Sequence, residues 1–201
     1  MVRYTSPQQK LEFLNKIIQK VNAQNILIFD NKKTQLQAVL AYLQGQGYKA
    51  ELVCKVDGYS AEPNNSAQMI EKKIKDFMAG KYQIMLTTNL LSRGIDMRKV
   101  TLVINYTLPI KIGPDTDRSK REVDLETYLH RVGRTGRFGD SGIALNFVNS
   151  EQEQSMLDEI TNYYKNSITE LNLDNLNKLN EELAKIDKIN DEKRKHIENI
   201  I

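Results

Sequence analysis

Three arginines spaced three residues apart have the clearest capacity for chemistry in this sequence. They are Arg131, Arg134 and Arg137, and Gly133 and Gly136 lie between them. Guanidinium groups bind phosphate oxygens through paired hydrogen bonds and stay charged at physiological pH. Glycines remove side-chain bulk, so a phosphate or another backbone can approach closely. On a helical or 3₁₀ turn Arg134 and Arg137 can share one face, which favours an anion site over a solvated basic loop.

A second polar cluster directly follows a short apolar run at residues 84–86. Its members are Thr87, Thr88, Asn89, Ser92, Arg93, Gly94 and Asp96. Threonines and backbone N–H groups beside a glycine suit contacts to a nucleic-acid backbone. Asp96 could accept hydrogen bonds from ribose hydroxyls, as acidic residues do in other nucleotide-binding folds. The alternative is a local ion pair between Arg93 and Asp96 that caps a turn.

Apolar patterns along the chain predict the elements that would position these clusters. We expect strands at residues 26–29, 52–54, 84–86, 102–104 and 143–148, and helices at about 8–21, 34–44, 67–78 and 151–164. Unbroken apolar strands suit a parallel sheet covered on both faces, and alternation with helices indicates a doubly wound α/β fold. Ligands of such folds bind outside the carboxyl ends of the strands, where the second cluster would lie.

Length and composition agree with an ordinary globular domain. The chain has 201 residues, 40% hydrophobic and 27% charged, and a net charge of only +3. Any nucleic-acid surface must therefore come from local clustering of basic residues. Cys54 is the only cysteine, which excludes a disulfide within the chain and a cysteine-rich metal site; we expect it to be a small buried hydrophobe. No apolar run approaches the ~20 residues that cross a bilayer, and the first residues lack a signal peptide's apolar core. We expect an intracellular protein with no membrane partner.

The last part of the chain carries a short apolar stripe with heptad-like spacing. The stripe consists of Leu176, Leu179, Leu183 and Ile186. It lapses at Asn190 and Lys193, so the pattern favours a terminal helix that docks on the domain, or frays, over a long coiled coil.

The two polar clusters together resemble motifs V and VI of the DEAD-box RNA helicases. The matching runs are Thr-Thr-Asn-x-x-Ser-Arg-Gly-Ile-Asp at 87–96 and His-Arg-x-Gly-Arg-Thr-Gly-Arg-Phe-Gly at 130–139, and residues 28–34 are similar to motif IV. The resemblance covers about residues 3–176. It implies a RecA-like doubly wound parallel sheet flanked by helices, the helicase C-terminal domain, at 1–166. A C-terminal helical extension would follow at 167–201.

The subgroup of mRNA-export helicases at the nuclear pore shows further similarity. It rests on the Thr-Thr-Asn opening, on Val-Ile-Asn-Tyr-x-Leu-Pro at 103–109, on a long insertion before Glu126, and on Ile-x-x-Leu-x-x-Asp-x-Leu at 168–176. The resemblance implies an RNA partner, an export activator, and a cytoplasmic or nuclear location, including the cytoplasmic face of the nuclear pore.

The resemblance also implies roles for single residues in an ATP site. Arg134 and Arg137 match the arginines that reach the γ-phosphate, and Arg137 would be the finger that stabilises charge during phosphoryl transfer. Asp96 matches the residue that contacts the ribose of ATP.

Other matched residues would touch RNA or the neighbouring domain. Those matching RNA contacts are Asn31, Thr88 and Gly94, and those matching bridges between the two RecA-like domains are Arg93, His130 and Arg131. Two departures stand out. Ile70 occupies the place of an expected arginine, which Lys72 or Lys73 could replace, and Asn31 stands where the family usually has threonine.

Two parts of an ATPase are absent from this sequence. It holds no Gly-x-x-x-x-Gly-Lys-Ser/Thr phosphate loop and no Asp-Glu-Ala-Asp stretch for magnesium. We therefore expect ATP and Mg²⁺ to be held mainly by an N-terminal RecA-like domain, no metal site in this chain, and no activity from this chain alone. The alternatives are a non-catalytic RNA- or protein-binding module that kept the fold, and a DNA translocase.

Overall fold

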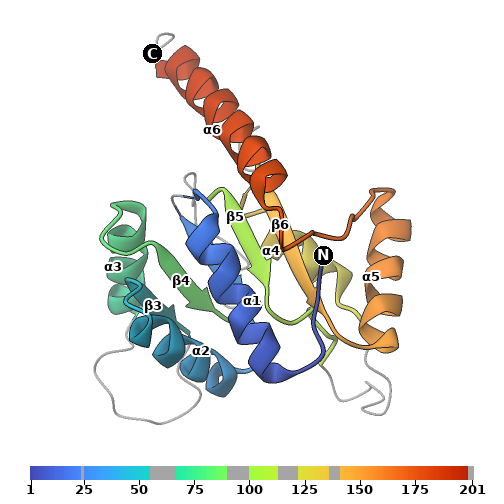
Figure 1. Cartoon of the computed structure of the whole chain (residues 1–201). Helices are drawn as coiled ribbons and strands as arrows, with labels where there is room; N and C mark the ends of the chain where they lie inside the picture. Colours follow the sequence, from blue (N-terminus) through green and yellow to red (C-terminus); the bar gives the residue numbers. More distant parts are fainter. Residues whose placement is uncertain (24, 55–66, 90–99, 113–121, 136–140, 199–201) are drawn as a thin grey trace.

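Six parallel strands form a single sheet in the order β1-β6-β5-β2-β4-β3 (Figure 1). The computed structural model describes residues 1–23, 25–54, 67–89, 100–112, 122–135 and 141–198. The strands are β1 (Val2–Arg3), β2 (Ile26–Phe29), β3 (Ala50–Val53), β4 (Ile84–Thr87), β5 (Leu102–Asn105) and β6 (Ile143–Val148). The five expected strands are confirmed with small shifts in their ends. β1 was not expected, because two residues are too short for a periodic pattern.

Six helices are described along the same residues. They are α1 (Pro7–Lys20), α2 (Lys33–Gly45), α3 (Ala67–Met78), α4 (Leu125–Val132), α5 (Glu151–Tyr164) and α6 (Asn177–Glu198). Serines begin two of them, since Ser6 Oγ accepts a hydrogen bond from Gln9 N and Ser150 Oγ accepts one from Glu153 N. Such side-chain caps satisfy backbone N–H groups that have no partner within the helix.

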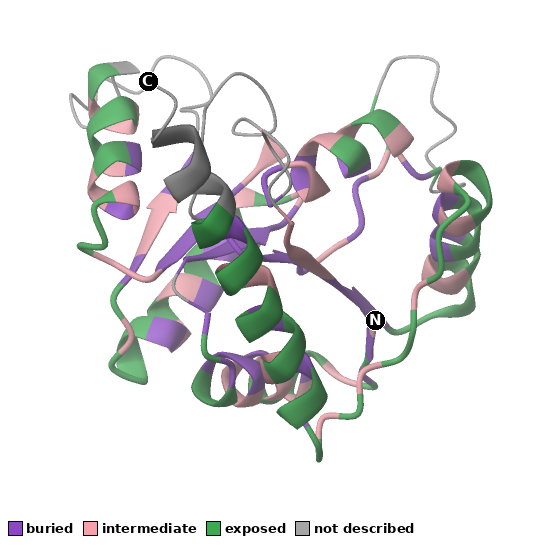
Figure 2. Cartoon of the chain, turned by 90° about the horizontal axis from the view of Figure 1, so that it is seen from above, coloured by how far each residue is buried: buried purple, intermediate pink, exposed green. Residues whose placement is uncertain are grey.

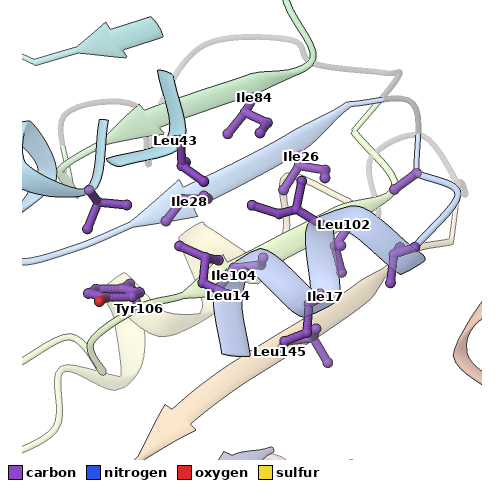
Figure 3. Packing of buried hydrophobic residues seen from close by; sticks show 14 of the residues in the cluster. Leu14, Ile17, Ile26, Ile28, Leu43, Ile84, Leu102, Ile104, Tyr106 and Leu145 are labelled. Carbon is purple, nitrogen blue, oxygen red and sulfur yellow. The ribbon is translucent and has the colours of Figure 1, made fainter. Parts of the chain in front are cut away.

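Alternate residues of the central strands enter different cores on the two faces of the sheet. Ile26 and Ile28 of β2 pack against α1, α2 and α6, whereas Leu27 and Phe29 of the same strand pack against α3. Figure 3 shows the first of these cores, with Leu14 and Ile17 of α1 lying over the strands. A third cluster lies between α4, α5 and the end of β6. In Figure 2 the strands are purple at the centre and the outer sides of the helices are green. The expected doubly wound α/β sheet is thus confirmed.

The connection from β4 to β5 creates a switch point in the sheet. The chain passes from β2 through β3 to β4 on one side of β2, and then crosses to β5 on its other side. The carboxyl ends of β2, β4 and β5 therefore lie side by side at one edge. In open α/β sheets this edge, outside the carboxyl ends of the strands, is where ligands bind.

The long helix α6 begins against the body of the domain and extends away from it toward the C-terminus (Figure 1). Leu176, Leu179 and Leu183 are buried in the core that also contains α1 and α2. The docked terminal helix inferred from the leucine stripe is confirmed. Asn190, where the stripe lapses, is buried as well, since its side chain accepts from Ser141 N (2.9 Å) and donates to Ser141 O (3.0 Å).

Candidate functional site

The helix α4 carries several of the residues that the motifs single out. It begins at a firm cap, because Asp124 Oδ1 accepts from Thr127 N (2.8 Å) and Oδ2 accepts from Thr127 Oγ1 (2.6 Å). It ends at Gly133, whose N–H donates to Leu129 O at 2.7 Å. A Cβ atom at Gly133 would lie only 2.9 Å from the same Leu129 oxygen, so this turn requires glycine. The cap and the glycine together fix where Arg131 and Arg134 leave the helix.

Arg131 lies completely buried at the switch point of the sheet. Its relative exposure is 0%, and all five of its N–H donors find acceptors. Nε and Nη2 donate to Asn89 Oδ1 at 2.9 and 2.6 Å, and Nη2 also donates to Asn31 Oδ1 at 2.7 Å. Nη1 donates to Thr107 O at 2.7 Å and to Asn105 Oδ1 at 3.3 Å. The guanidinium thus joins the carboxyl ends of β2, β4 and β5 to α4.

The oxygens that accept hydrogen bonds from the Arg131 guanidinium are all uncharged. Its guanidinium carbon lies 5.2 Å from the centre of the Phe29 ring, a distance at which a cation is attracted to the π face. Burial lowers the pKa of Arg131 to about 9, while the carboxylates of Asp30 and Asp124 act in the opposite direction. The side chain therefore remains a cation at neutral pH. A buried cation whose donors are all bonded orients its surroundings firmly.

Asn31 and Thr88, the described residues matched to RNA contacts, lie beside this cluster. Asn31 Nδ2 donates to Leu108 O (2.7 Å), and the Asn31 N–H donates to Thr107 Oγ1 (3.1 Å). Its side-chain oxygen is already bonded to Arg131, so both ends of the Asn31 amide serve the fold in this structure. Thr88 is half-buried just beyond β4 and accepts a hydrogen bond at its backbone oxygen from Thr87 Oγ1 (3.2 Å).

His130 and Arg134 also belong to the α4 end of the site. Arg134 is 2% exposed, and its Nε donates to His130 O at 3.1 Å. His130 Nδ1 lies 3.9 Å from Glu126 Oε1 on the preceding helical turn, a contact that becomes an ion pair only when the imidazole is protonated. The remaining candidate residues, Arg93, Gly94, Asp96 and Arg137, lie outside the described residues.

A cavity of about 430 Å³ opens next to Asn31 at the same edge of the sheet. Its charged and polar lining includes Lys10, Asp30, Lys32, Gln35, Thr107 and Glu153. Lys10 is 3% exposed, and its ammonium lies 3.9 Å from the centre of the Tyr106 ring; burial lowers its pKa to about 8. Asp30 is fully buried, which raises its pKa, and its Oδ2 has no hydrogen-bond partner in the described structure.

Sequence reasoning passed over Lys10 and Asp30. A signal for Lys10 was present, because it stands four residues before Leu14 on the buried face of α1. A charged residue in such a register is either paired or held near a cavity.

The basic residues expected to replace an arginine at position 70 differ in their surroundings. Ile70 packs against the core under α3. Lys73 Nζ is bonded to Glu51 Oε1 at 2.7 Å and donates to Leu52 O at 3.3 Å, whereas Lys72 is exposed. Of the two lysines, Lys72 is therefore the one whose side chain points to solvent.

Two kinds of feature are not found in the part of the chain that the structure describes. No group of three or more histidine, cysteine, aspartate or glutamate residues is placed to hold a metal ion there. Among the described helices, none combines the length and the apolar character required to cross a membrane.

Comparison with known families and sequences gives consistent matches over most of the chain. The family of the helicase conserved C-terminal domain matches residues 9–139. An ATP-dependent RNA helicase dbp5 of Botryotinia fuckeliana is 36% identical over 177 residues, which are 88% of this chain and 35% of that protein. The chain thus spans about a third of the length of this curated relative.

Solved structures of Dbp5 resemble this fold. The C-terminal domain of the DEAD-box protein Dbp5 aligns with a TM-score of 0.72 and 26% identity over 92% of this chain and 96% of that domain. S. cerevisiae Dbp5 bound to RNA and ADP BeF3 aligns with a TM-score of 0.76 and 26% identity over 92% of this chain and 44% of that one. A variant of S. cerevisiae Dbp5 bound to Nup159, Gle1, IP6 and ADP aligns with a TM-score of 0.69 and 25% identity. This alignment covers 93% of this chain and 44% of that one.

Proposed function

Because this chain belongs to the family of the helicase conserved C-terminal domain and is a Dbp5-like C-terminal domain of a DEAD-box RNA helicase, we propose that it completes the ATP site of its whole protein. In that role Arg134 and Arg137 reach the γ-phosphate of an ATP molecule and Asp96 contacts its ribose. An upstream RecA-like domain holds the phosphates and Mg²⁺. An arginine finger of this kind is worth roughly 10³–10⁵ in rate.

The position of α4 is the observation that supports this proposal most. The helix ends at the switch point of the sheet, and buried Arg131 fixes it to the ends of three strands. Arg134 directly follows Gly133, the residue that caps the end of this helix. An arginine finger must be held in a fixed position, because electrostatic stabilisation of a transition state depends on donors that are already in place.

RNA and protein partners follow from the same family membership. We assign to this domain contacts with an RNA backbone through Thr88, Gly94 and Asn31, and contacts with the upstream domain through Arg93 and His130. Arg131, whose donors are all bonded within this chain, serves the same interface by holding α4 in place. The known Dbp5 complexes contain RNA, Gle1, IP6 and Nup159, so an export activator and a location at the nuclear pore are part of the proposal.

A second candidate function is a non-catalytic RNA- or protein-binding module. Ile70, where an arginine was expected, is a half-buried apolar residue that packs against the core, and the Asn31 amide is bonded on both sides. Each observation weakens the case for one expected RNA contact, at position 70 and at Asn31. Nucleotide-independent RNA binding by the whole protein would favour this candidate.

Nucleotide-dependent RNA binding tests the proposal directly. The whole protein is titrated into labelled single-stranded RNA with ADP BeF3, and fluorescence anisotropy reports the Kd. We expect ADP BeF3 to tighten binding of the wild type, and Arg134→Ala to abolish the gain. Arg3→Ala is the matched control, because this half-exposed arginine is bonded to Glu170 and Gln154 and to none of the residues assigned to ATP or RNA, so its loss should leave the gain intact. Equal gains in wild type and Arg134→Ala would refute the assignment.

A further inference from the structure

A chain of buried hydrogen bonds extends from Arg131 across β5 and β6 and back to α4. Arg131 Nη1 donates to Asn105 Oδ1 (3.3 Å), Asn105 Nδ2 donates to Asn146 Oδ1 (2.8 Å), and Asn146 Nδ2 donates to Tyr128 Oη (3.2 Å). Asn105, Asn146 and Tyr128 are exposed by only 0%, 1% and 5%. Asn105 and Asn146 are direct neighbours in the register of β5 and β6. The network therefore starts and ends on α4, at residues one helical turn apart.

The guanidinium dictates the direction of every bond in this chain. Arg131 has donors only, so Asn105 must present its oxygen to it and its Nδ2 to Asn146. Asn146 must then present its oxygen to Asn105 and its own Nδ2 to Tyr128. A single donor-only group thus fixes two buried amides, and in return the amides admit one orientation of Arg131.

The two asparagines stand in strands that are otherwise apolar. β5 reads Leu-Val-Ile-Asn and β6 reads Ile-Ala-Leu-Asn-Phe-Val. Asparagine is disfavoured in strands and costly to bury unless it is bonded. Packing alone would be served better by an apolar residue, so the amide of Asn146 has a role in holding its polar neighbours.

We propose that Asn146 is a positioning residue that acts through Asn105 to hold Arg131 in one orientation, and with it the end of α4 that carries Arg134. In the described part of the chain, Asn146 does not line the cavity beside Asn31, and its side chain is bonded to Asn105 and Tyr128. Its effect on the orientation of Arg131 concerns this chain alone. Only its effect on ATP turnover rests on the proposed function.

The network separates two substitutions of similar size. Asn146→Leu removes the acceptor of Asn105 Nδ2, so that the Asn105 amide can turn and withdraw its oxygen from Arg131 Nη1, which then keeps only its bond to Thr107 O. Asn146→Asp keeps an acceptor toward Asn105 and can accept the hydroxyl hydrogen of Tyr128, so the direction of bonds toward Arg131 is preserved. Leu145→Val is the matched control, because Leu145 lies on the same strand but enters the opposite core.

Exchange of the Arg131 Nε–Hε proton with water, followed by ¹H–¹⁵N NMR of this chain, tests the orienting role. We expect slow exchange in the wild type, in Asn146→Asp and in Leu145→Val, and exchange at least about tenfold faster in Asn146→Leu. Tyr128→Phe, which deletes only the last acceptor, should give a smaller acceleration and serves if Asn146→Leu does not fold. Unchanged Arg131 exchange in both Asn146→Leu and Tyr128→Phe would overturn the proposal.

ATP turnover by the whole protein tests the consequence separately. We expect Asn146→Leu to lower kcat about tenfold with little change in KM for ATP, because the finger is misplaced while nucleotide binding by the upstream domain is kept. Asn146→Asp should restore most of kcat. Faster Arg131 exchange with unchanged kcat would overturn the link to turnover. A wild type without turnover would contradict the proposed function, while the NMR result would still decide the role of Asn146.

Discussion

Replacing Arg131 by lysine should destabilise this domain although the positive charge is kept. The guanidinium makes five hydrogen bonds to Asn89, Asn31, Asn105 and Thr107 in a planar arrangement. An ammonium has three donors on one nitrogen and cannot reach acceptors that are spread around the edge of that plane. Lysine therefore leaves at least two of these bonds unmade in a fully buried site.

The size of the effect follows from the lost bonds. Hydrogen bonds to a charged group contribute about 1.5 kcal/mol each at the low end of their range, so two lost bonds predict a decrease of about 3 kcal/mol in the free energy of unfolding. Because domains of this kind are stable by roughly 5–15 kcal/mol, the variant should still fold.

Urea denaturation of wild type and Arg131→Lys, followed by circular dichroism, measures this difference. The control is Arg3→Lys, because Arg3 is half-exposed and its single contacts to Glu170 and Gln154 lie in solvent. The control should lose less than about 1 kcal/mol. A loss of that small size for Arg131→Lys would refute the reading of Arg131 as a fully bonded buried anchor.

Three further perturbations have defined outcomes. Asp124→Ala should lower the free energy of unfolding by about 1 kcal/mol through loss of the α4 cap, whereas Asp124→Asn should retain most of it; equal losses in urea titrations would argue against the cap. Burial lowers the pKa of Lys10 to about 8 from its ordinary value of 10.5, so between these values the unfolded chain holds a proton that the folded chain has lost. The contribution of Lys10 to the free energy of unfolding should therefore rise as the pH rises from about 8 to 10.5. Urea midpoints measured at these two pH values should show the rise in the wild type but not in Lys10→Met. Asn190→Ala removes two hydrogen bonds to Ser141 and should speed amide exchange in the second half of α6; unchanged protection would show that this contact does not hold the helix.

The sheet was predictable because its signal is local. β2, β4, β5 and β6 are short apolar runs, and each is buried on both faces as such runs require. The spacing of the leucines likewise predicted which face of α6 packs against the domain. β1 has only two residues, and it pairs with β6 almost at the other end of the chain, so no local pattern announces it.

The surroundings of Arg131 could not be predicted from its motif. Its acceptors Asn89 and Asn31 are 42 and 100 residues away in sequence, and nothing in their local pattern links them to one guanidinium. The motif match indicated a bridge between domains, which stays a prediction. Within this chain, the folded structure places Arg131 as the anchor of three strand ends.

Asn190 illustrates the same difference between local pattern and tertiary contact. It interrupts the leucine stripe, yet it is 2% exposed because Ser141 offers both a donor and an acceptor from before β6. A polar residue in an apolar stripe signals either exposure or a specific partner, and only the fold distinguishes them.

RNA-stimulated ATP hydrolysis by the whole protein, wild type beside Arg137→Ala, tests whether this domain supplies an arginine finger. We expect RNA to stimulate ATP turnover in the wild type, and Arg137→Ala to lose roughly 10³-fold or more in kcat while RNA binding is retained. Full turnover by Arg137→Ala would contradict the assignment of a finger to this domain. Absence of turnover in the wild type would instead support the non-catalytic module.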